Sequence, residues 1–231
     1  MNVAIVVAGG QGTRFGGHRP KQFLEIKGIP VIIHTLRRFE ESQQIERVVV
    51  VLPAPDVDAF QTVIEEFALE KVHRVVAGGE TRAQSVKNGL AAIDEAMVVA
   101  VHDAVRPLVT TEEIDCVVAA AVESGAAILV TAVSDTIKEI EAERIVRTIS
   151  RSELRRALTP QAFHFQILKR AYQDLEQLET TGIDVTDDSF LVERLSIPVT
   201  VVEGSARNLK ITTPEDLAIA EALLKNVVSS Q

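Results

Sequence analysis

The stretch Val7-Ala8-Gly9-Gly10-Gln11-Gly12-Thr13-Arg14-Phe15, followed by Pro20-Lys21-Gln22-Phe23, decides how the rest of this chain is interpreted. It comes directly after residues 3–7, an apolar run rich in β-branched residues that predicts a buried strand. The glycines allow a tight turn and the close approach of a ligand to the backbone. Successive N–H groups in such a turn can bind an anion. Arg14 and Lys21 add positive charge, so the stretch is suited to a nucleoside triphosphate.

The two common phosphate-binding motifs do not fit this stretch. The dinucleotide pattern G-x-G-x-x-G can start at Gly10, but Phe15 replaces its last glycine. The P-loop pattern can start at Gly12, but His18 stands where lysine is required. What remains, A-G-G-x-G-x-R-x(6)-K, resembles the signature loop of nucleotidyltransferases that join a sugar or polyol phosphate to a nucleoside monophosphate. A solvated turn after an edge strand is the alternative.

The composition limits what the 231 residues can be. Their length allows one large α/β domain or two small ones, and 46% hydrophobic residues suffice for a sizeable core. A net charge of −9 argues against a nucleic-acid-binding protein. The one cysteine, Cys116, excludes an internal disulfide and is expected in the core. Because neither a leader nor a membrane-length apolar run is present, we expect a cytoplasmic protein without a membrane partner.

Short apolar runs alternate with amphipathic segments along the chain. This alternation predicts βαβ units, and therefore an α/β fold with a mostly parallel sheet and helices on both faces. Thr110 and Glu113 are spaced as a capping box, and Gly125 is expected to end the same helix. The expected strands are residues 3–7, 48–52, 72–76, 98–101, 127–131 and 199–202, and the expected helices are residues 30–41, 56–67, 82–95, 111–124 and a segment that starts at Thr213-Pro214.

One segment departs from this alternation. Residues 135–141 and 144–150 have the pattern of two strands joined at Ala142-Glu143, which predicts a hairpin. An isolated hairpin is only marginally stable in water. We therefore interpret residues 134–155 as an arm that projects from the sheet and needs a partner surface. An ordinary hairpin at the edge of the same sheet is the alternative.

The apolar side chains of the arm suggest what that partner is. Ile137, Ile145 and Ile149 exceed what a two-stranded ribbon can bury. A symmetric homodimer with exchanged arms would cover them, because a two-fold contact uses the same patch twice. Arg151 lies at the base of the arm, so we predict that it enters the active site of the other subunit. An arm that folds back, with Arg151 acting within its own subunit, is the alternative.

Two further motifs follow expected strands. In Gly78-Gly79-Glu80-Thr81-Arg82-Ala83-Gln84-Ser85-Val86, Gly79 could lie against a planar base and Ser85 could hydrogen-bond it; the alternative is a loop in which Thr81 caps a helix and Arg82 is solvated. In Val101-His102-Asp103-Ala104-Val105-Arg106-Pro107, Asp103 could ligate Mg²⁺, and Arg106 could bind phosphate or fix the loop. A packing role is expected for His102.

Two motifs in the second half have generic alternatives. Thr186-Asp187-Asp188 offers two adjacent carboxylates, which suit a metal site but are more often a helix cap or a loop. Lys210 stands between apolar neighbours before a capped helix, where a surface lysine is the generic interpretation.

Taken in order, the motifs resemble one family over nearly the whole chain. The glycine-rich loop with Arg14 and Lys21 is followed by G-G-E-T-R-x-x-S-V, H-D-A-V-R-P, D-T-I-K, L-T-P-Q-A-F, T-D-D and N-L-K-I-T-T-P-E-D-L. This series is similar to bacterial 2-C-methyl-D-erythritol 4-phosphate cytidylyltransferases. The resemblance implies a single Rossmann-like nucleotidyltransferase domain over residues 1–231 with a dimerising β-arm. It also implies that CTP and the polyol phosphate react, with Mg²⁺, to a cytidine diphosphate alcohol and pyrophosphate of the non-mevalonate isoprenoid route.

The resemblance also assigns roles to residues. It implies a triphosphate loop of Ala8, Gly9, Gly10, Gly12, Thr13, Arg14 and Lys21 and a cytosine pocket of Gly79, Glu80 and Ser85. It places the ribose, the metal and the substrate at Asp103, Ala104 and Arg106, with Asp103 as the metal residue. Contacts to the alcohol phosphate are implied for Thr136, Arg151, Thr159 and Thr186, and the candidate catalytic residues are Arg14, Lys21, Arg151 and Lys210.

Two rival functions remain. This family often has a second alanine at the position of Gly9. Gly9-Gly10, with Lys21-Gln22-Phe23, also resembles the sister family that cytidylylates ribitol 5-phosphate, whereas R-R-A-L-T-P-Q favours the methylerythritol enzyme. A dinucleotide-binding oxidoreductase or regulator on the same fold is disfavoured by Phe15. Because the substrate phosphate is already a nucleophile, catalysis would need positioning and charge neutralisation rather than a general base.

Overall fold

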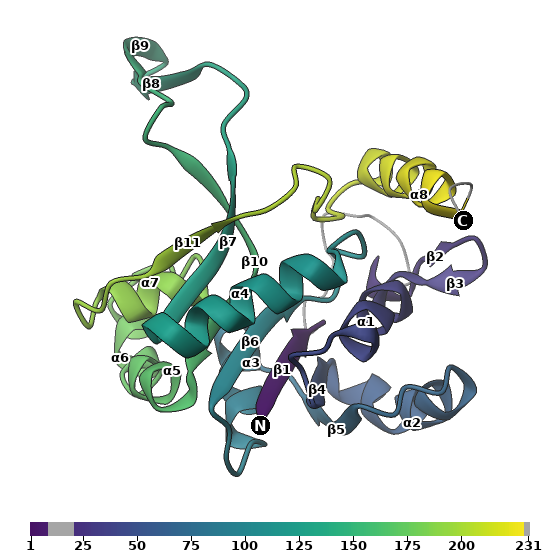
Figure 1. Cartoon of the computed structure of the whole chain (residues 1–231). Coiled ribbons are helices and arrows are strands. Elements are labelled where there is room, and N and C mark those ends of the chain that lie inside the picture. The colour runs from purple at the N-terminus through teal and green to yellow at the C-terminus, as the bar shows by residue number, and fades with distance from the viewer. Residues whose placement is uncertain (9–20, 229–231) are drawn as a thin grey trace.

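A seven-stranded sheet forms the centre of the molecule (Figure 1). The computed structural model describes residues 1–8 and 21–228, with side chains as far as residue 224. All neighbouring strands are parallel except that β10 runs antiparallel to β6 and to β7. The strand order is β11 (Thr200–Glu203), β7 (Ala126–Ala132), β10 (Arg155–His164), β6 (Val98–Asp103), β1 (Asn2–Val7), β4 (Arg47–Leu52) and β5 (Val72–Ala77).

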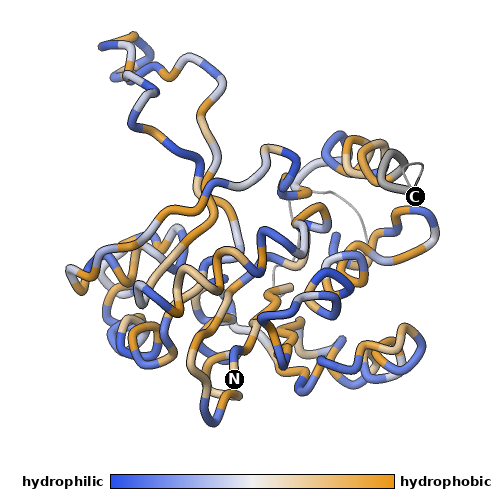
Figure 2. Tube along the Cα trace, in the orientation of Figure 1, coloured by the Kyte–Doolittle hydropathy of each residue, from blue (hydrophilic) through white to orange (hydrophobic). Residues whose placement is uncertain are grey.

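Helices cover both faces of this sheet because successive strand residues point to opposite sides. In β1, Ala4 and Val6 pack toward one face, whereas Val3 and Ile5 pack toward the other. Figure 2 shows the hydrophobic residues concentrated along these central strands. The first face carries α1 (Val31–Glu41), α2 (Val57–Glu66) and α4 (Thr111–Ser124); the second carries α3 (Arg82–Ala91), α5 (Phe165–Ala171), α6 (Leu175–Thr180) and α7 (Asp188–Glu193).

The predicted α/β class and the mostly parallel sheet are confirmed. The α4 helix begins with the predicted capping box of Thr110 and Glu113, and Gly125 ends it with a φ of 87°, a conformation that glycine adopts without strain. The α3 helix is shorter than predicted and ends at Ala91. Strand β10 was not predicted, since Pro160 interrupts its pattern; the register with β7 shifts between Ala157 and Gln161 around this proline.

The remaining elements lie at one end of the sheet. The short pair β2 (Glu25–Ile26) and β3 (Ile29–Pro30) packs under α8 (Pro214–Val228) through Ile26, Ile211 and Leu224. The structure also contains two short 3₁₀ turns, η2 (Lys21–Phe23) and η3 (Ala54–Asp56). This packing brings the segment before α8, which contains Lys210, to the carboxyl end of the central strands.

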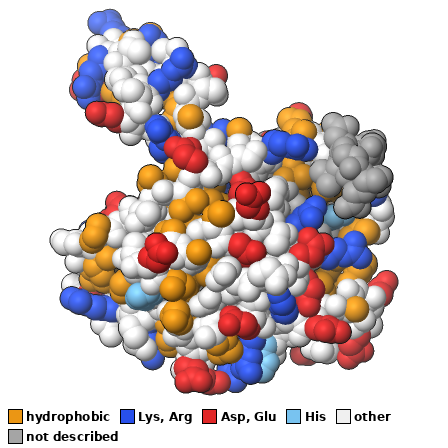
Figure 3. All heavy atoms as spheres, viewed as in Figure 1, with side chains coloured by type: hydrophobic (Ala, Val, Ile, Leu, Met, Phe, Trp, Pro, Cys, Tyr) orange, Lys and Arg blue, Asp and Glu red, His pale blue; other side chains and the backbone are white. Residues whose placement is uncertain are grey.

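The predicted hairpin is present as β8 (Ile137–Glu141) and β9 (Arg144–Ile149). Over the described residues these strands pair only with each other, and Figure 1 shows them far from the sheet at the end of extended connections from β7 and β10. The alternative of an edge hairpin on the main sheet is therefore wrong. Apolar Ile140 and Ile145 are 68% and 65% exposed, and Figure 3 shows hydrophobic and charged side chains together on this projection.

One sequence expectation about the core is wrong. Cys116 was expected to be buried, but the α4 helix turns it toward solvent while Ile114, Val117 and Val118 face the sheet. The neighbours of Cys116 in the sequence are apolar, but only every third or fourth residue of a helix shares a face.

No helix among the described residues has both the length and the apolar character needed to cross a membrane.

Candidate active site

A cavity of about 210 Å³ opens where the strand order reverses. The chain passes from β1 to β4 and β5 on one side and returns to β6 on the other, which leaves a crevice beside the carboxyl ends of β1 and β6. Ligands of open α/β sheets bind in such crevices. The described residues that line the cavity are Val7, Ala8, Lys21, Gln22, Glu80, Thr81, Arg82, Asp103, Val105 and Lys210.

The ends of the glycine-rich stretch are tied together at this cavity. Buried Gln22 donates from Nε2 to the carbonyl of Ala8 at 2.9 Å, and the amide of Ala8 donates to the carbonyl of Val51 at 2.8 Å. Lys21, in η2, therefore stands beside the end of β1 and lines the cavity. The other predicted loop residues, Gly9, Gly10, Gly12, Thr13 and Arg14, lie outside the described residues.

Asp103, at the end of β6, is surrounded by three cationic side chains. Arg82 Nε lies 3.0 Å from Oδ1, whereas Arg106 Nε and Lys210 Nζ lie 3.2 Å and 3.0 Å from Oδ2. We call these four residues the Asp103 cluster. Arg106 also donates to the carbonyl of Asn208 at 2.9 Å, which fastens the segment before Lys210 to the loop after β6.

The cluster is electrostatically positive although it lies in an acidic protein. Burial alone would raise the pKa of Asp103, but Arg82, Lys210 and Arg106 together hold it well below its ordinary value. Asp103 is thus a permanent anion whose charge is more than neutralised. The cavity also has Lys21 on its wall, so its described lining favours an anionic ligand.

Arg82 connects the cluster to a second buried carboxylate. Its Nη2 donates to Oδ2 of Asp188 at 2.8 Å, and Asp188 is 0% exposed. The Tyr172 hydroxyl donates to the other oxygen of Asp188. The sequence interpretation of Arg82 as solvated is wrong, and the contacts of Asp188 and Tyr172 were missed. The signal available was the carboxylate pair at Asp187-Asp188, of which Asp187 does cap α7 by accepting from the Phe190 amide.

The predicted base-binding loop is an ordered turn at the start of α3. The Gly79 amide donates to Ser85 Oγ at 3.1 Å, and Ser85 Oγ donates to the carbonyl of Thr81 at 3.0 Å. Thr81 caps the helix by accepting from the Gln84 amide, as predicted. A Cβ at Gly79 would lie 2.4 Å from Cβ of Gln84, so only glycine fits this turn. The backbone here, together with exposed Glu80, lies at the cavity wall.

His102 has the predicted packing role, and it is neutral. Burial lowers its pKa to about 3, and its ring lies 5.1 Å from the ring of Phe39. Nε2 lies 3.3 Å from the carbonyl of Arg106, which can only accept, so Nε2 carries the proton. Nδ1 then accepts from the Thr159 hydroxyl at 2.9 Å, and Thr159 Oγ1 accepts from the Asp103 amide at 3.2 Å.

The structure brings some predicted site residues together and leaves others apart. Ala104 is buried beside Asp103, where its amide donates to the carbonyl of Val7 at 2.9 Å. Thr159 supports the backbone at Asp103 through the bonds just described. Thr136 and Arg151 are exposed on the arm, Arg151 donating to the carbonyl of Ser134, and Thr186 is exposed before α7. The contacts that these residues were expected to make with the alcohol phosphate stay predictions.

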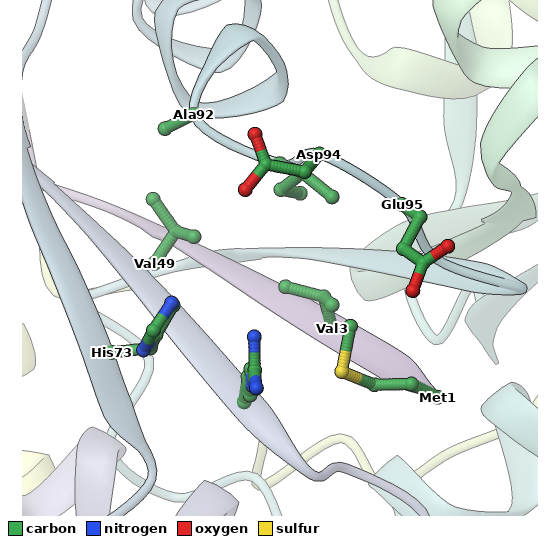
Figure 4. Close-up of a pocket in the computed structure, with 9 residues that line it drawn as sticks. Met1, Val3, Val49, His73, Ala92, Asp94 and Glu95 are labelled. Carbon is green, nitrogen blue, oxygen red and sulfur yellow. The ribbon is translucent and has the colours of Figure 1, made fainter.

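A second hollow of about 320 Å³ lies at the opposite end of the strands (Figure 4). It is formed at the amino ends of β1, β4 and β5 and is lined by Met1, Val3, Val49, His73 and Asp94 among others. Open α/β sheets bind their ligands at the carboxyl ends of the strands, not at this end. The described residues show no group of three or more His, Cys, Asp or Glu side chains placed to hold a metal ion, here or in the first cavity.

Comparison with known proteins identifies the family. The family model described as 2-C-methyl-D-erythritol 4-phosphate cytidylyltransferase matches residues 2–226. The chain belongs to this family.

Similar proteins of the family span nearly the whole length of the chain. The 2-C-methyl-D-erythritol 4-phosphate cytidylyltransferase of Syntrophus aciditrophicus is 45% identical over 226 residues, which cover 96% of this chain and 95% of the relative. That of Bacillus velezensis is 43% identical, with 96% and 95% covered. The crystal structure of 4-diphosphocytidyl-2C-methyl-D-erythritol synthase from Anaerococcus prevotii is 30% identical, has a TM-score of 0.84 and is covered over 97% and 96% of the two chains.

Proposed function

We propose that this chain transfers the cytidylyl group of CTP to 2-C-methyl-D-erythritol 4-phosphate, giving 4-(cytidine 5′-diphospho)-2-C-methyl-D-erythritol and pyrophosphate. The observation that carries the proposal is the positively charged cavity at the reversal of the strand order, in a chain that belongs to this cytidylyltransferase family. An acidic protein that concentrates cations around one cavity is suited to polyanionic substrates.

The reaction asks the protein for charge and position. An oxygen of the alcohol phosphate attacks the α-phosphorus of CTP, and the bond from that phosphorus to the oxygen shared with the β-phosphate breaks, releasing pyrophosphate. The attacking phosphate is ionised at neutral pH and needs no general base, and His102 is neutral with both ring nitrogens engaged. Lys21 and Arg14 would offset charge on the triphosphate, while Lys210 would orient the attacking phosphate.

Mg²⁺ fits this site as an ion brought by the nucleotide. Both oxygens of Asp103 already accept from cationic groups, and a carboxylate has about four lone-pair positions, so Asp103 has room for a metal or for one of its waters. Mg²⁺ usually takes one or two carboxylates and several phosphate or water oxygens. The bound ion would neutralise charge on the triphosphate. Asp103 would hold or orient it, as the sequence predicts.

The proposal treats residues 1–231 as one nucleotidyltransferase domain that acts as a homodimer with exchanged arms. Exposed Ile140 and Ile145 support it, because a two-stranded ribbon does not cover them. Exchange would carry Thr136 and Arg151 of each arm to the site of the other subunit. The cytoplasmic location and the absence of a nucleic-acid partner stay predictions from the sequence.

Pyrophosphate release tests the reaction. The wild-type protein is incubated with CTP, ATP, GTP or UTP, with either 2-C-methyl-D-erythritol 4-phosphate or ribitol 5-phosphate, and with Mg²⁺ or excess EDTA. We expect release that needs CTP, methylerythritol phosphate and Mg²⁺ together. Faster turnover of ribitol phosphate would assign the chain to the sister activity, and comparable kcat/KM for CTP and ATP would contradict the cytosine pocket.

Subunit complementation tests the exchanged arms. Chains carrying Arg151→Ala and chains carrying Lys21→Ala, each nearly inactive alone, are mixed under conditions in which subunits exchange. If Arg151 acts in the other subunit, one of the two sites of a mixed dimer has both native residues, and activity returns toward half. Mixed dimers proven by tagging that remain inactive would show that Arg151 acts within its own subunit.

A further inference from the structure

Behind Arg82, which lines the cavity, lies a buried pair, Asp188 and Tyr172, that the reaction scheme does not use. Asp188 is completely buried, yet one of its oxygens accepts from Arg82 and the other from Tyr172. The Tyr172 side chain is 3% exposed, and burial together with Asp188 raises its pKa well above the ordinary value, so the phenol stays protonated and donates. Unlike Asp188, Arg82 reaches the cavity.

Asp188 is itself fixed by two other elements. The amides of Asp188 and Ser189 both donate to Oε1 of Gln161, at 3.0 Å and 2.9 Å, which joins the start of α7 to β10. Tyr172 comes from the end of α5. A carboxylate held in this way has little freedom to move, and it binds Nη2 of Arg82, whereas Asp103 binds Nε of the same side chain.

The geometry of Arg82 explains what such a fixed partner can do. The guanidinium bridges the two carboxylates, Nε to Asp103 and Nη2 to Asp188. Through Nε it fixes Oδ1 of Asp103, while Lys210 pairs with Oδ2. If Arg82 lost its anchor it could turn toward the triphosphate, and Asp103 could rotate and take Lys210 with it. Arg is suited to this bridging because its donors lie in one rigid plane.

We infer that the Asp188–Tyr172 pair positions Arg82, and through it Asp103 and Lys210, for the transfer reaction. Asp188 and Tyr172 are positioning residues, since neither lines the cavity. The inference rests on the proposed function and adds to it the residues that hold the Asp103 cluster in position. Its consequence is a loss of rate when the anchor is removed, with a smaller change in the KM for CTP, because the cations remain present while their arrangement changes.

A double-mutant cycle tests the inference. Asp188→Asn keeps the size of the side chain and removes its charge; we expect kcat to fall about 10- to 100-fold and the KM for CTP to change less than about threefold. Arg82→Met removes the group through which Asp188 acts. In the Arg82→Met background, Asp188→Asn should cause no further loss. Equal factors of loss in both backgrounds would mean that Asp188 only supports the packing of α7, and would overturn the inference.

Control variants separate positioning from folding. Tyr172→Phe keeps the charge pair and should give a smaller loss than Asp188→Asn, and it replaces that variant in the cycle if Asp188→Asn does not fold. Val192→Ala shortens a buried side chain on α7, the helix that contains Asp188. It should lower the Tm without changing kcat per folded enzyme molecule.

A readout independent of activity completes the test. The Arg82 Nε–H, which donates to Asp103, should give a slowly exchanging NMR signal in the wild type that Asp188→Asn weakens and Val192→Ala preserves. A wild type without pyrophosphate release would contradict the proposed function, and this signal would still decide the positioning role. An Arg82 signal unchanged by Asp188→Asn would overturn the inference whatever the activity.

Discussion

The Asp103 cluster and the arm contain the same kind of interaction in opposite surroundings. In the cluster, Arg82 pairs with Asp103, and their side chains are 24% and 8% exposed. In the arm, Arg147 pairs with Glu139, and their side chains are 69% and 46% exposed. The first pair belongs to a network that joins β6, α3 and α7, whereas the second joins only the two strands of a hairpin.

This difference in burial determines how much each pair matters. Water and salt screen an exposed ion pair, which usually stabilises a protein by less than about 1 kcal/mol. A buried carboxylate surrounded by cations cannot be replaced by water, so removing it leaves charges unpaired. The charges of the cluster are therefore expected to be essential for structure and reaction, whereas those of the exposed Arg147–Glu139 pair can be varied. The following predictions test this contrast.

The largest expected effect is on the rate. Lys210→Ala, like Lys21→Ala and Arg14→Ala, should lower kcat by about two to four orders of magnitude, because each removes a cation expected to orient the attacking phosphate or to offset charge in the transition state. Steady-state pyrophosphate release measures the loss. Lys87→Ala is the matched control: Lys87 pairs with exposed Glu176 away from the cavity, so its loss should leave kcat within about twofold of the wild type. Near wild-type turnover of folded Lys210→Ala would remove Lys210 from the reaction.

The next effect is on stability. Asp103→Asn should lower the free energy of unfolding by about 3 kcal/mol, because three cations lose their common partner. Urea unfolding with an unchanged m-value measures the change. In the arm, Glu139→Gln should cost less than about 0.5 kcal/mol. If the two substitutions cost the same, burial would not explain the contrast between the regions.

The third effect appears with pH. The pKa of His102 is about 3 in the folded protein and 6.5 ordinarily, so between these values the unfolded chain binds more protons. The free energy of unfolding should therefore fall as the pH falls from about 6.5, by up to about 1.4 kcal/mol per pH unit for this group. Asp103 acts at lower pH, since its pKa is depressed: its stabilisation is present above the ordinary carboxylate range and is lost as the pH falls toward its folded value.

Two histidine variants isolate the contribution of His102. His102→Gln should be less stable than the wild type at pH 7 but should show a flatter pH dependence between pH 6.5 and pH 4, measured by urea unfolding at each pH. His73→Gln, at an exposed histidine, should keep the wild-type slope. Some slope should remain in both, because burial also lowers the pKa of His34. Identical slopes for His102→Gln and the wild type would contradict a buried neutral His102.

The same contrast explains what could be predicted from the sequence. The arm was predicted because its signal is local: two β-type runs are joined by Ala142-Glu143. The glycine-rich stretch and the loop after β6 were predicted as site segments because each follows a strand, and the family resemblance supplied the roles of their residues. The bridge from Arg82 to Asp188 was not predicted, since 106 positions separate these residues and neither local sequence requires the other. Strand β10, whose Gln161 accepts a hydrogen bond from the amide of Asp188, was missed because Pro160 interrupts its strand pattern.

The smallest expected effect is at the tip of the arm. Ala142 and Glu143 connect β8 to β9 with φ values of 42° and 68°, as in the two-residue turns that favour Asn-Gly. Residues other than glycine are strained in this region, so Ala142→Asn combined with Glu143→Gly should stabilise the hairpin by less than about 1 kcal/mol. Because β8 and β9 pair only with each other over the described residues, the gain should appear as up to about fivefold slower amide exchange in these strands, with the midpoint of global unfolding unchanged. Glu141→Gly, which places glycine in the strand just before the turn, should speed exchange instead. A shift of the global midpoint with the turn variant would show that the arm unfolds together with the sheet, and the contrast between a supported site and an independent arm would then fail.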